Sequence, residues 1–336
     1  MLTIDLTAED LTRLRVAARP DPMWDVVLSL HLLQNRQAAI AFDPWRSQVR
    51  ARVVEAGLAR TVAALARLAP WASYFPDFLT PTPTDLGSGS ATPVEVAVDR
   101  VASTPRQRLT RELAVTFPAG APSWVRRIAS GETEAMRWLA GALHRYHDVA
   151  VAPYAPATGV AVAADQVARD AALRRGGVRG LMASFDPVLR RVDDGTWAGR
   201  YPVTRALPLR GRPLTVIPSV FCVLAPVALA DEALDPALVY PVAPAPGWLA
   251  CADAVDGERP PVAHLIGPTR ARVLEVLDVG RTTTALARVL DLTPATASRH
   301  ATVLREAGLV SSQRQGNCVV HTRTPLGDAL LAGHLA

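Results

Sequence analysis

Arginine, serine, threonine and histidine side chains gather near the C-terminal end, where residues 281–323 contain six arginines and two acidic residues. The formal net charge of the whole chain is +5, so most of its excess positive charge lies in this segment. Guanidinium groups pair with phosphates and with the acceptors of guanine, and hydroxyl groups donate to phosphates. A basic patch confined to one segment is the electrostatic footprint of a nucleic-acid-binding surface. Arginine supplies all 36 basic residues, a composition bias that is weak evidence by itself.

Two short helices separated by a tight turn are predicted to carry these polar groups. The first helix is predicted over residues 283–290. Its apolar residues fall on one face: Leu286, Ala287 and Leu290. Leu292 anchors the turn. Thr293 and Pro294 then signal a second helix, because threonine caps a helix and proline at the first helical position loses no needed hydrogen bond.

The second helix, predicted over residues 294–306, has distinct inward and outward faces. Ala297, Ala301 and Leu304 fall together and should pack inward, whereas Arg299 falls on the opposite side. The fork of the Arg299 guanidinium matches the two acceptors of guanine, so this residue is the candidate for base reading. Neighbouring hydroxyls can donate to phosphates or touch thymine methyl groups. The candidate DNA-contacting residues are Thr296, Ser298, Arg299, His300, Thr302, Arg305 and Arg314.

A β-hairpin is predicted directly after the second helix. Gly308 ends that helix as a left-handed cap, residues 309–313 and 318–323 form the strands, and residues 314–317 form the turn. Arg314 at the tip could reach the sugar-phosphate backbone or the minor groove. This order of elements is that of a winged helix-turn-helix, which lays one helix in the major groove of double-stranded DNA.

Each candidate side chain also has a simpler interpretation. An outward arginine is more often a solvated surface residue than a base contact. His300 lies at the edge of the packed face, where it could touch a phosphate or simply join the two helices. The complete order of helix, turn, helix, glycine and hairpin favours the functional interpretation for the module as a whole.

Residues 265–331 resemble the winged-helix regulators of the ArsR type. The resemblance is carried by residues 284–290, 292–300 and 304–310 and by the hairpin after them. It implies a cytoplasmic homodimer that binds a palindromic operator, usually as a repressor released by a signal. The remainder of the chain resembles a long actinobacterial subgroup with an uncharacterised N-terminal domain, through residues 74–81, 216–221 and 324–331.

The sequence departs from the metal sensors of that family, which often carry paired cysteines on the first helix of the motif. Residues 282–288 contain no thiol, and Cys318 lies alone in the predicted hairpin. Metal sensing at this position is therefore unsupported. We expect the N-terminal region to sense a non-metal signal, with a small-molecule effector as a candidate partner.

The fold class expected for the whole chain is mainly α with a small β component. We place an N-terminal regulatory or dimerisation region at residues 1–262 and the DNA-binding domain at residues 263–336, with a loop at residues 80–93. Helices are predicted over residues 23–35, 45–68, 94–116, 123–150 and 160–182. Strands are predicted over residues 199–203, 214–217, 220–223 and 238–242. A short first strand is followed by a helix that Thr7 caps, with Asp10 at its third position.

Composition favours a globular protein of the cytoplasm, with 49% hydrophobic and 20% charged residues. The first ten residues are acidic and lack an apolar signal core. The most apolar run, residues 214–230, is broken by Pro218 and Pro226 and is too short to span a bilayer. Three widely separated cysteines form no disulfide framework. We therefore expect no membrane partner.

The N-terminal region contains residues that could serve other chemistry. His144 and His147 lie one helical turn apart, as in some zinc sites, but no third ligand is identifiable. An aromatic set could line a ligand pocket or form core: Trp24, Trp45, Trp71, Phe75, Phe78, Trp124 and Trp138. Nucleophile-elbow, Walker, dinucleotide-binding and zinc-protease motifs are absent from the sequence. We expect no catalytic residue, metal or cofactor; an N-terminal enzyme or protein-interaction domain remains the alternative.

Overall fold

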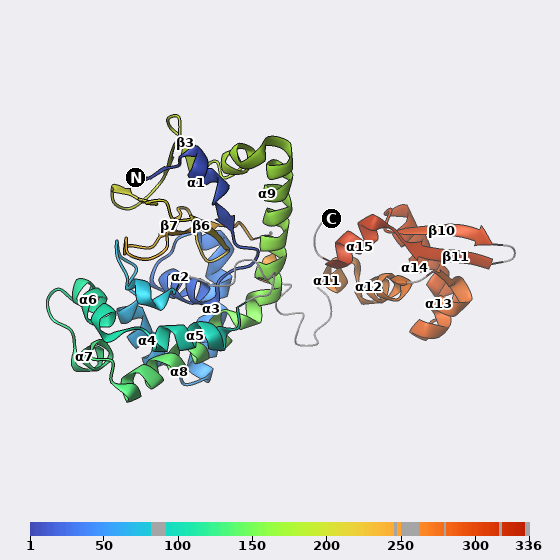
Figure 1. Ribbon diagram of the computed structural model, residues 1–336. Helices are drawn as coiled ribbons and strands as arrows, with labels where there is room; N and C mark the ends of the chain where they lie inside the picture. Colours follow the sequence, from blue (N-terminus) through green and yellow to red (C-terminus); the bar gives the residue numbers. More distant parts are fainter. Residues whose placement is uncertain (82–91, 245–246, 250–261, 279, 316–317, 333–336) are drawn as a thin grey trace. The chain divides into compact units, whose positions relative to one another are not determined.

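The computed structural model describes residues 1–81, 92–244, 247–249, 262–278, 280–315 and 318–332. The chain divides into two compact units, Met1–Pro246 and Gly247–Ala336. The domain boundary that we predict near residue 263 follows a stretch outside the described residues, so it stays a prediction. Most of the predicted loop at residues 80–93 also lies outside them. The predicted fold class is confirmed, since helices dominate and the strands form three small sheets (Figure 1).

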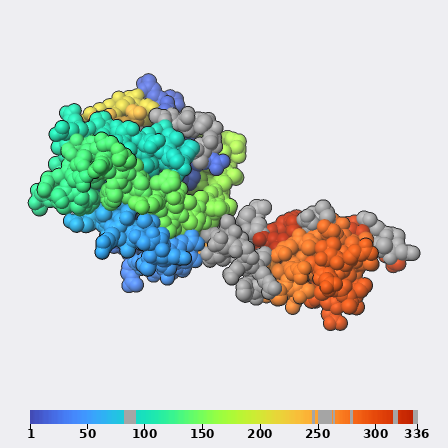
Figure 2. Space-filling view, turned by 90° about the horizontal axis from the view of Figure 1, so that it is seen from below, coloured from blue at the N-terminus to red at the C-terminus, as the bar shows by residue number. Residues whose placement is uncertain are grey.

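Helices make up one half of the N-terminal unit. The longest helices of this half are α2 (Pro22–Gln34), α3 (Ala39–Glu55), α4 (Ala59–Leu68), α5 (Val94–Ala102), α6 (Arg106–Thr116), α7 (Ser123–Ala129) and α8 (Thr133–Ala150). Helix α8 packs against α2, α3, α4, α5 and α7 and is therefore the centre of the group. On the face seen in Figure 2, these helices supply most of the surface, in teal and green.

Three of the predicted helices are each divided in two, and the sequence explains where. The helix predicted over residues 123–150 breaks at Gly131, whose φ of 70° lies in the left-handed region. The helix predicted over residues 45–68 breaks at Gly57, whose φ of 66° lies in the left-handed region that glycine tolerates best. The helix predicted over residues 94–116 breaks before α6, because the residue before Pro105 is disfavoured in helical conformation. All three continuous predictions were therefore wrong at these points, although helical periodicity is present on either side.

Two four-stranded sheets complete the N-terminal unit. In the first, β1 (Leu2–Asp5) lies between β4 (Thr196–Gly199) and β5 (Arg205–Ala206), and β3 (Leu189–Arg191) flanks β4. The second has the order β2 (Arg15–Val16), β6 (Thr215–Ser219), β8 (Ala237–Pro241) and β7 (Val227–Ala228), with β6 parallel to both β2 and β8. Helix α9 (Ala155–Ala183) runs along one edge of the unit (Figure 1).

The strands predicted over residues 214–217 and 238–242 correspond to β6 and β8, but two other strand predictions were wrong. Only Gly199 of the strand predicted over residues 199–203 is in a strand, at the end of β4. Residues 220–223 are not a strand, although residues 220–222 are buried. The Ser219 hydroxyl accepts hydrogen bonds from the backbone N–H groups of Phe221 and Cys222 and turns the chain. The predicted cap of the first helix, α1 (Ala8–Thr12), is confirmed, since Thr7 and Asp10 form a capping box.

The aromatic set divides between core and surface. Trp24, Trp45 and Phe78 are fully buried and belong to the core. Trp124 and Trp138 pack edge to face at 5.9 Å between ring centroids. Trp71 and Phe75 line a cavity described below. Among the described helices, none combines the length and apolar composition that crossing a bilayer requires.

A buried carboxyl group joins the helical half to the second sheet. The hydroxyl of Ser219 in β6 donates a hydrogen bond of 2.6 Å to Asp25 in α2. Burial raises the pKa of Asp25 to about 7, and the neighbouring Asp21 adds to this increase. The unfolded carboxyl ionises near pH 4, so the folded state gives up stability as pH rises from about 4 to about 7.

We predict that Asp25→Asn raises the free energy of unfolding above pH 7 by roughly 1–4 kcal/mol, because the amide keeps the acceptor for Ser219 without a charge to bury. Urea unfolding between pH 4 and pH 8 measures this effect. The wild type should lose stability across that range relative to Asp25→Asn. The exposed control Asp99→Asn should follow the wild type. Parallel pH profiles for wild type and Asp25→Asn would contradict the buried-acid account.

Candidate nucleic-acid interface

The C-terminal unit has the element order of a winged helix-turn-helix. Its elements are α11 (Val262–Ile266), α12 (Pro268–Glu275), η4 (Val276–Asp278), β9 (Arg281–Thr282), α13 (Thr283–Leu290), α14 (Pro294–Glu306), β10 (Val310–Gln315), β11 (Cys318–Arg323) and α15 (Pro325–Ala332). Helices α13 and α14 have the bounds that the sequence predicts. Strands β10 and β11 form the wing and, with β9, an antiparallel sheet of order β10-β11-β9.

One apolar core holds the two helices of the motif together. The predicted inward residues of α13 are buried, and Ala297, Ala301 and Leu304 of α14 are at most 1% exposed. They belong to one cluster with residues of α12, η4 and the start of the wing: Val273, Leu274, Leu277, Leu309 and Val310. Leu292 packs partly buried against the same cluster. Methyl groups on α14 allow the neighbouring helices to approach closely, and leucine and valine on the other elements supply the bulk.

Both ends of α14 are fixed by hydrogen bonds that the sequence predicts. The Thr293 hydroxyl accepts from the Thr296 backbone N–H at 3.2 Å, and Pro294 occupies the first helical position. At the other end Gly308 has a φ of 73°. The backbone N–H of Leu309 donates to the Leu304 carbonyl at 2.9 Å, as in a Schellman motif. The helix therefore begins and ends at defined positions, and its outward face has a fixed direction.

The turn between the helices depends on a residue that sequence reasoning did not single out. Asp291 adopts a left-handed conformation, with φ of 54°, at the end of α13. Aspartate is among the few residues other than glycine that visit this region with local hydrogen bonding. The next residue, Leu292, donates its backbone N–H to the Ala287 carbonyl at 2.8 Å and closes the turn.

The outward face of α14 presents Ser298, Arg299 and Arg305 to solvent. The guanidinium of Arg299 makes no hydrogen bond or ion pair with another described residue. Thr302 is half-buried beside them. Thr296 is also half-buried, and its hydroxyl lies 2.8 Å from the Thr293 hydroxyl, so it serves the helix cap as well as the face. The most accessible donors of the helix therefore lie around Arg299.

His300 links this face to α12. Partial burial lowers its pKa, and the positive charges of Arg270 and Arg299 lower it further. The imidazole is therefore neutral near pH 7, and Arg270 contributes a second cation beside Arg299. Sequence reasoning missed Arg270, because it confined the basic patch to residues 281–323. An arginine two residues after the proline that begins a helix offers no signal of this kind; the packing of α12 on α14 is what brings Arg270 near the face of α14.

The wing differs from its prediction at the tip. Strand β10 continues to Gln315, so Arg314 lies within a strand, paired with Val319, instead of in the predicted turn over residues 314–317. Antiparallel pairing therefore extends two residues beyond Gln313, where the sequence predicts that the first strand ends. Residues 316 and 317 lie outside the described residues. Arg314 is exposed, as a backbone-contacting residue must be.

A buried histidine connects the wing to the first helix of the motif. His321 in β11 is 6% exposed, and its Nε2 lies 3.0 Å from the Thr283 hydroxyl while its Nδ1 lies 2.8 Å from the Ser312 hydroxyl. Burial lowers the pKa of His321, and Arg305 lowers it further. A neutral imidazole can donate to one hydroxyl and accept from the other. The sequence marked His321 only as a strand residue.

The remaining candidates belong to other parts of the sequence. His144 lies 3.1 Å from Asp148 and 3.5 Å from Glu95, in partly exposed ion pairs of the N-terminal unit. Within the described ranges, no group of three or more His, Cys, Asp or Glu side chains is arranged to hold a metal. Burial raises the pKa of the Cys222 thiol. Cys251 and the side chain of Cys318 lie outside what the structure describes.

Comparison with known proteins agrees with this geometry. Residues 265–313 match the family model of a helix-turn-helix domain, a stretch that includes α12, α13, α14 and the first part of the wing. A search of curated proteins and a search of solved structures each find no match. The C-terminal unit is thus a helix-turn-helix domain, and the chain is a DNA-binding regulator.

We predict that protection of the wing against hydrogen exchange decreases as pH falls below about 6.5. The reason is that His321 binds a proton more readily in the unfolded state than in the folded state, where it is buried. The contribution of neutral His321 is complete above the unfolded pKa and is lost toward lower pH. Exchange at the β11 and α13 amides, corrected for the intrinsic rate, measures this change between pH 5 and pH 8.

The variant His321→Gln should flatten that pH dependence, since glutamine can still bond both hydroxyls without titrating. His144→Gln, on the partly exposed histidine of the N-terminal unit, is the matched control and should leave the wing profile unchanged. An equally steep profile in His321→Gln would show that another group governs the wing.

Proposed function

We propose that this chain is a transcriptional repressor that binds a palindromic operator as a homodimer and is released by a non-metal signal acting on the N-terminal unit. The observation that carries the proposal is the exposed Arg299, without a partner among the described residues, on a helix whose opposite face is fully buried. A helix held in this way can be inserted into the major groove as a rigid body.

The base-reading step follows from the chemistry of the outward face. Arg299 lies in the N-terminal half of α14, the part that contacts base edges in this motif. Its guanidinium donates two parallel hydrogen bonds to O6 and N7 of a guanine. Ser298 beside it and half-buried Thr302 one turn later donate to phosphates or touch a thymine methyl group.

The flanking cations position the helix without reading sequence. Arg270 on α12 and Arg305 near the end of α14 approach the phosphates on either side, and Arg314 on β10 approaches the backbone from the wing. His300 is neutral between Arg270 and Arg299, so it donates or accepts a hydrogen bond instead of adding charge. Binding should accordingly weaken with salt, as phosphate-dominated association does.

Two copies are proposed because one recognition helix reads only a few base pairs. A dimer with two-fold symmetry places two such helices on half-sites about one helical turn apart, and this makes the operator palindromic. The resemblance of residues 265–331 to ArsR-type regulators supports both the dimer and repression. Sensing is assigned to the N-terminal unit because the first helix of the motif carries no thiol.

Arg299→Ala is expected to weaken binding to the operator at the chain's own locus by about 1–3 kcal/mol and to relax the base preference at one position of each half-site. Fluorescence anisotropy at fixed ionic strength measures affinity for the operator and for each base variant. Arg272→Ala is the matched control. It removes an exposed arginine of α12 that lies two residues after Arg270 and about 200° around the helix from it.

Arg272→Ala should leave the base preference intact. Equal losses of operator affinity in both variants, without any change in base preference, would show that Arg299 contributes only positive charge to binding. Unchanged affinity and preference in Arg299→Ala would remove α14 from the proposed groove face.

A further inference from the structure

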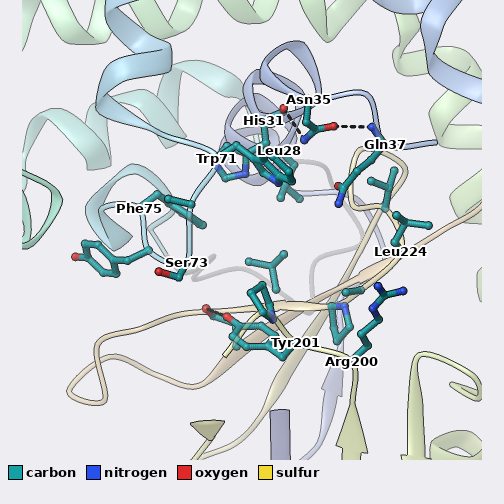
Figure 3. A pocket seen from close by; sticks show the side chains of 18 of the residues that line it. Leu28, His31, Asn35, Gln37, Trp71, Ser73, Phe75, Arg200, Tyr201 and Leu224 are labelled. Carbon is teal, nitrogen blue, oxygen red and sulfur yellow. Dashed lines mark hydrogen bonds between the residues drawn. The ribbon is translucent and has the colours of Figure 1, made fainter. Parts of the chain in front are cut away.

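A cavity of about 450 Å³ opens into the N-terminal unit beside α2. Its volume lies within the range of about 300–1,000 Å³ that small-molecule sites occupy. The walls come from the C-terminal half of α2 and from three other segments, within residues 71–77, 200–205 and 221–230. Figure 3 shows His31 and Trp71 on one side of the cavity, with Arg200 and Tyr201 across from them. Segments distant in sequence therefore converge on one space.

His31 supplies a polar atom that the described protein leaves without a partner. The side chain is 8% exposed and lines the cavity, and its Nε2 has no hydrogen-bond partner. The other ring nitrogen bonds the Pro70 carbonyl, so it carries the proton. Burial lowers the pKa of His31 to about 4, and the ring is therefore neutral at pH 7. Its Nε2 offers a lone pair but has almost no accessible surface, so an N–H or O–H group of a ligand would bond it once the neighbouring side chains shift slightly.

The surfaces around His31 favour a flat, aromatic ligand. Phe75 packs edge to face on His31, with 5.2 Å between ring centroids. Leu28 and Phe221 add buried apolar surface to the lining. Trp71 is 52% exposed, so an indole face is accessible at the entrance. Ring faces and aliphatic side chains of this kind bury planar molecules with little loss of their own conformational freedom.

Charge in the lining favours an anion. Arg200 is exposed at the cavity and makes no ion pair or hydrogen bond with a described residue. Arg205 lies nearby, but Leu229 and Ala230 hold its guanidinium through their carbonyls. The carboxyl of Asp77 accepts hydrogen bonds from the backbone N–H groups of Ala230 and Asp231. Those two N–H groups stabilise the negative charge of Asp77. Arg200 is therefore the charged side chain of the lining that is most accessible to a ligand.

We propose that this cavity is the effector site of the N-terminal unit and that its ligand is a planar aromatic anion that donates one hydrogen bond to His31 Nε2 and pairs with Arg200. The effector role of this ligand rests on the proposed function. Binding of the ligand to the cavity does not depend on it. A metal ion does not fit, because the lining offers one neutral imidazole and a carboxylate already held by the backbone.

Two fluorescent probes test the two contacts separately in the full chain without DNA. 8-Anilinonaphthalene-1-sulfonate carries linked aromatic rings, an N–H group and a sulfonate, and N-phenyl-1-naphthylamine is the same ring system without the sulfonate. The wild type should bind both at one site and prefer the sulfonate. Arg200→Gln should weaken binding of the sulfonate by about three- to ten-fold and leave the neutral probe unchanged. Arg210→Gln, on an exposed arginine outside the cavity that pairs with Glu232, should change neither.

His31→Phe should weaken both probes by about three- to ten-fold, since the ring keeps its shape and loses the acceptor. The ¹⁵N signal of the His31 ring in the wild type measures the same contact without a substitution and should shift when N-phenyl-1-naphthylamine is added. Equal effects of Arg200→Gln and Arg210→Gln, or a ring signal that does not move at saturation, would overturn the proposal. DNA binding would survive that failure, and probe binding would survive loss of operator recognition in Arg299→Ala.

Discussion

Burial of one narrow face of α14 is the constraint on which the DNA-binding surface depends. Ala297 and Ala301 are fully buried, so the helix can turn or slide only by opening the core that α12, α13 and the wing share with it. Thr293 and Gly308 fix where the helix begins and ends. Because one face is held, the direction of the other face is fixed. Arg299 is presented there without a hydrogen bond or ion pair to another described residue. The recognition chemistry thus follows from packing on the opposite side of the helix.

Three buried polar side chains of the described residues, His321, Asp25 and His31, differ in whether they have hydrogen-bond partners. His321 has a partner at each ring nitrogen, and Asp25 has the Ser219 hydroxyl, so both join elements that are distant in sequence. His31 is buried as deeply, but one ring nitrogen faces no described partner. An unsatisfied buried acceptor lowers stability by about 1–3 kcal/mol, and such a group in a cavity suggests a ligand more than a structural role. Trp24 Nε1 is also buried without a partner, but of these two side chains only His31 lines the cavity that we propose as the effector site.

Sequence predicted the recognition module well because its signals are local. The Thr293-Pro294 start, the left-handed Gly308 and apolar spacing within two turns all act between neighbouring residues, and both helices begin and end where predicted. Signals that depend on packing were missed: Arg270 comes from another helix, and His321 gains its role from two elements beyond its own strand. In the N-terminal unit, the cavity lies between segments as much as 202 residues apart, from Leu28 to Ala230. No spacing rule connects them.

Selection of duplexes from a random-sequence library by the full chain, at physiological ionic strength, tests the central claim most directly. The account predicts enrichment of a two-fold symmetric motif, with half-sites about one helical turn apart and a guanine at one position of each half. It also predicts loss of that guanine from the motif that Arg299→Ala selects. A library that remains random after repeated rounds, although the protein retains duplex DNA at low salt, would contradict sequence reading by α14.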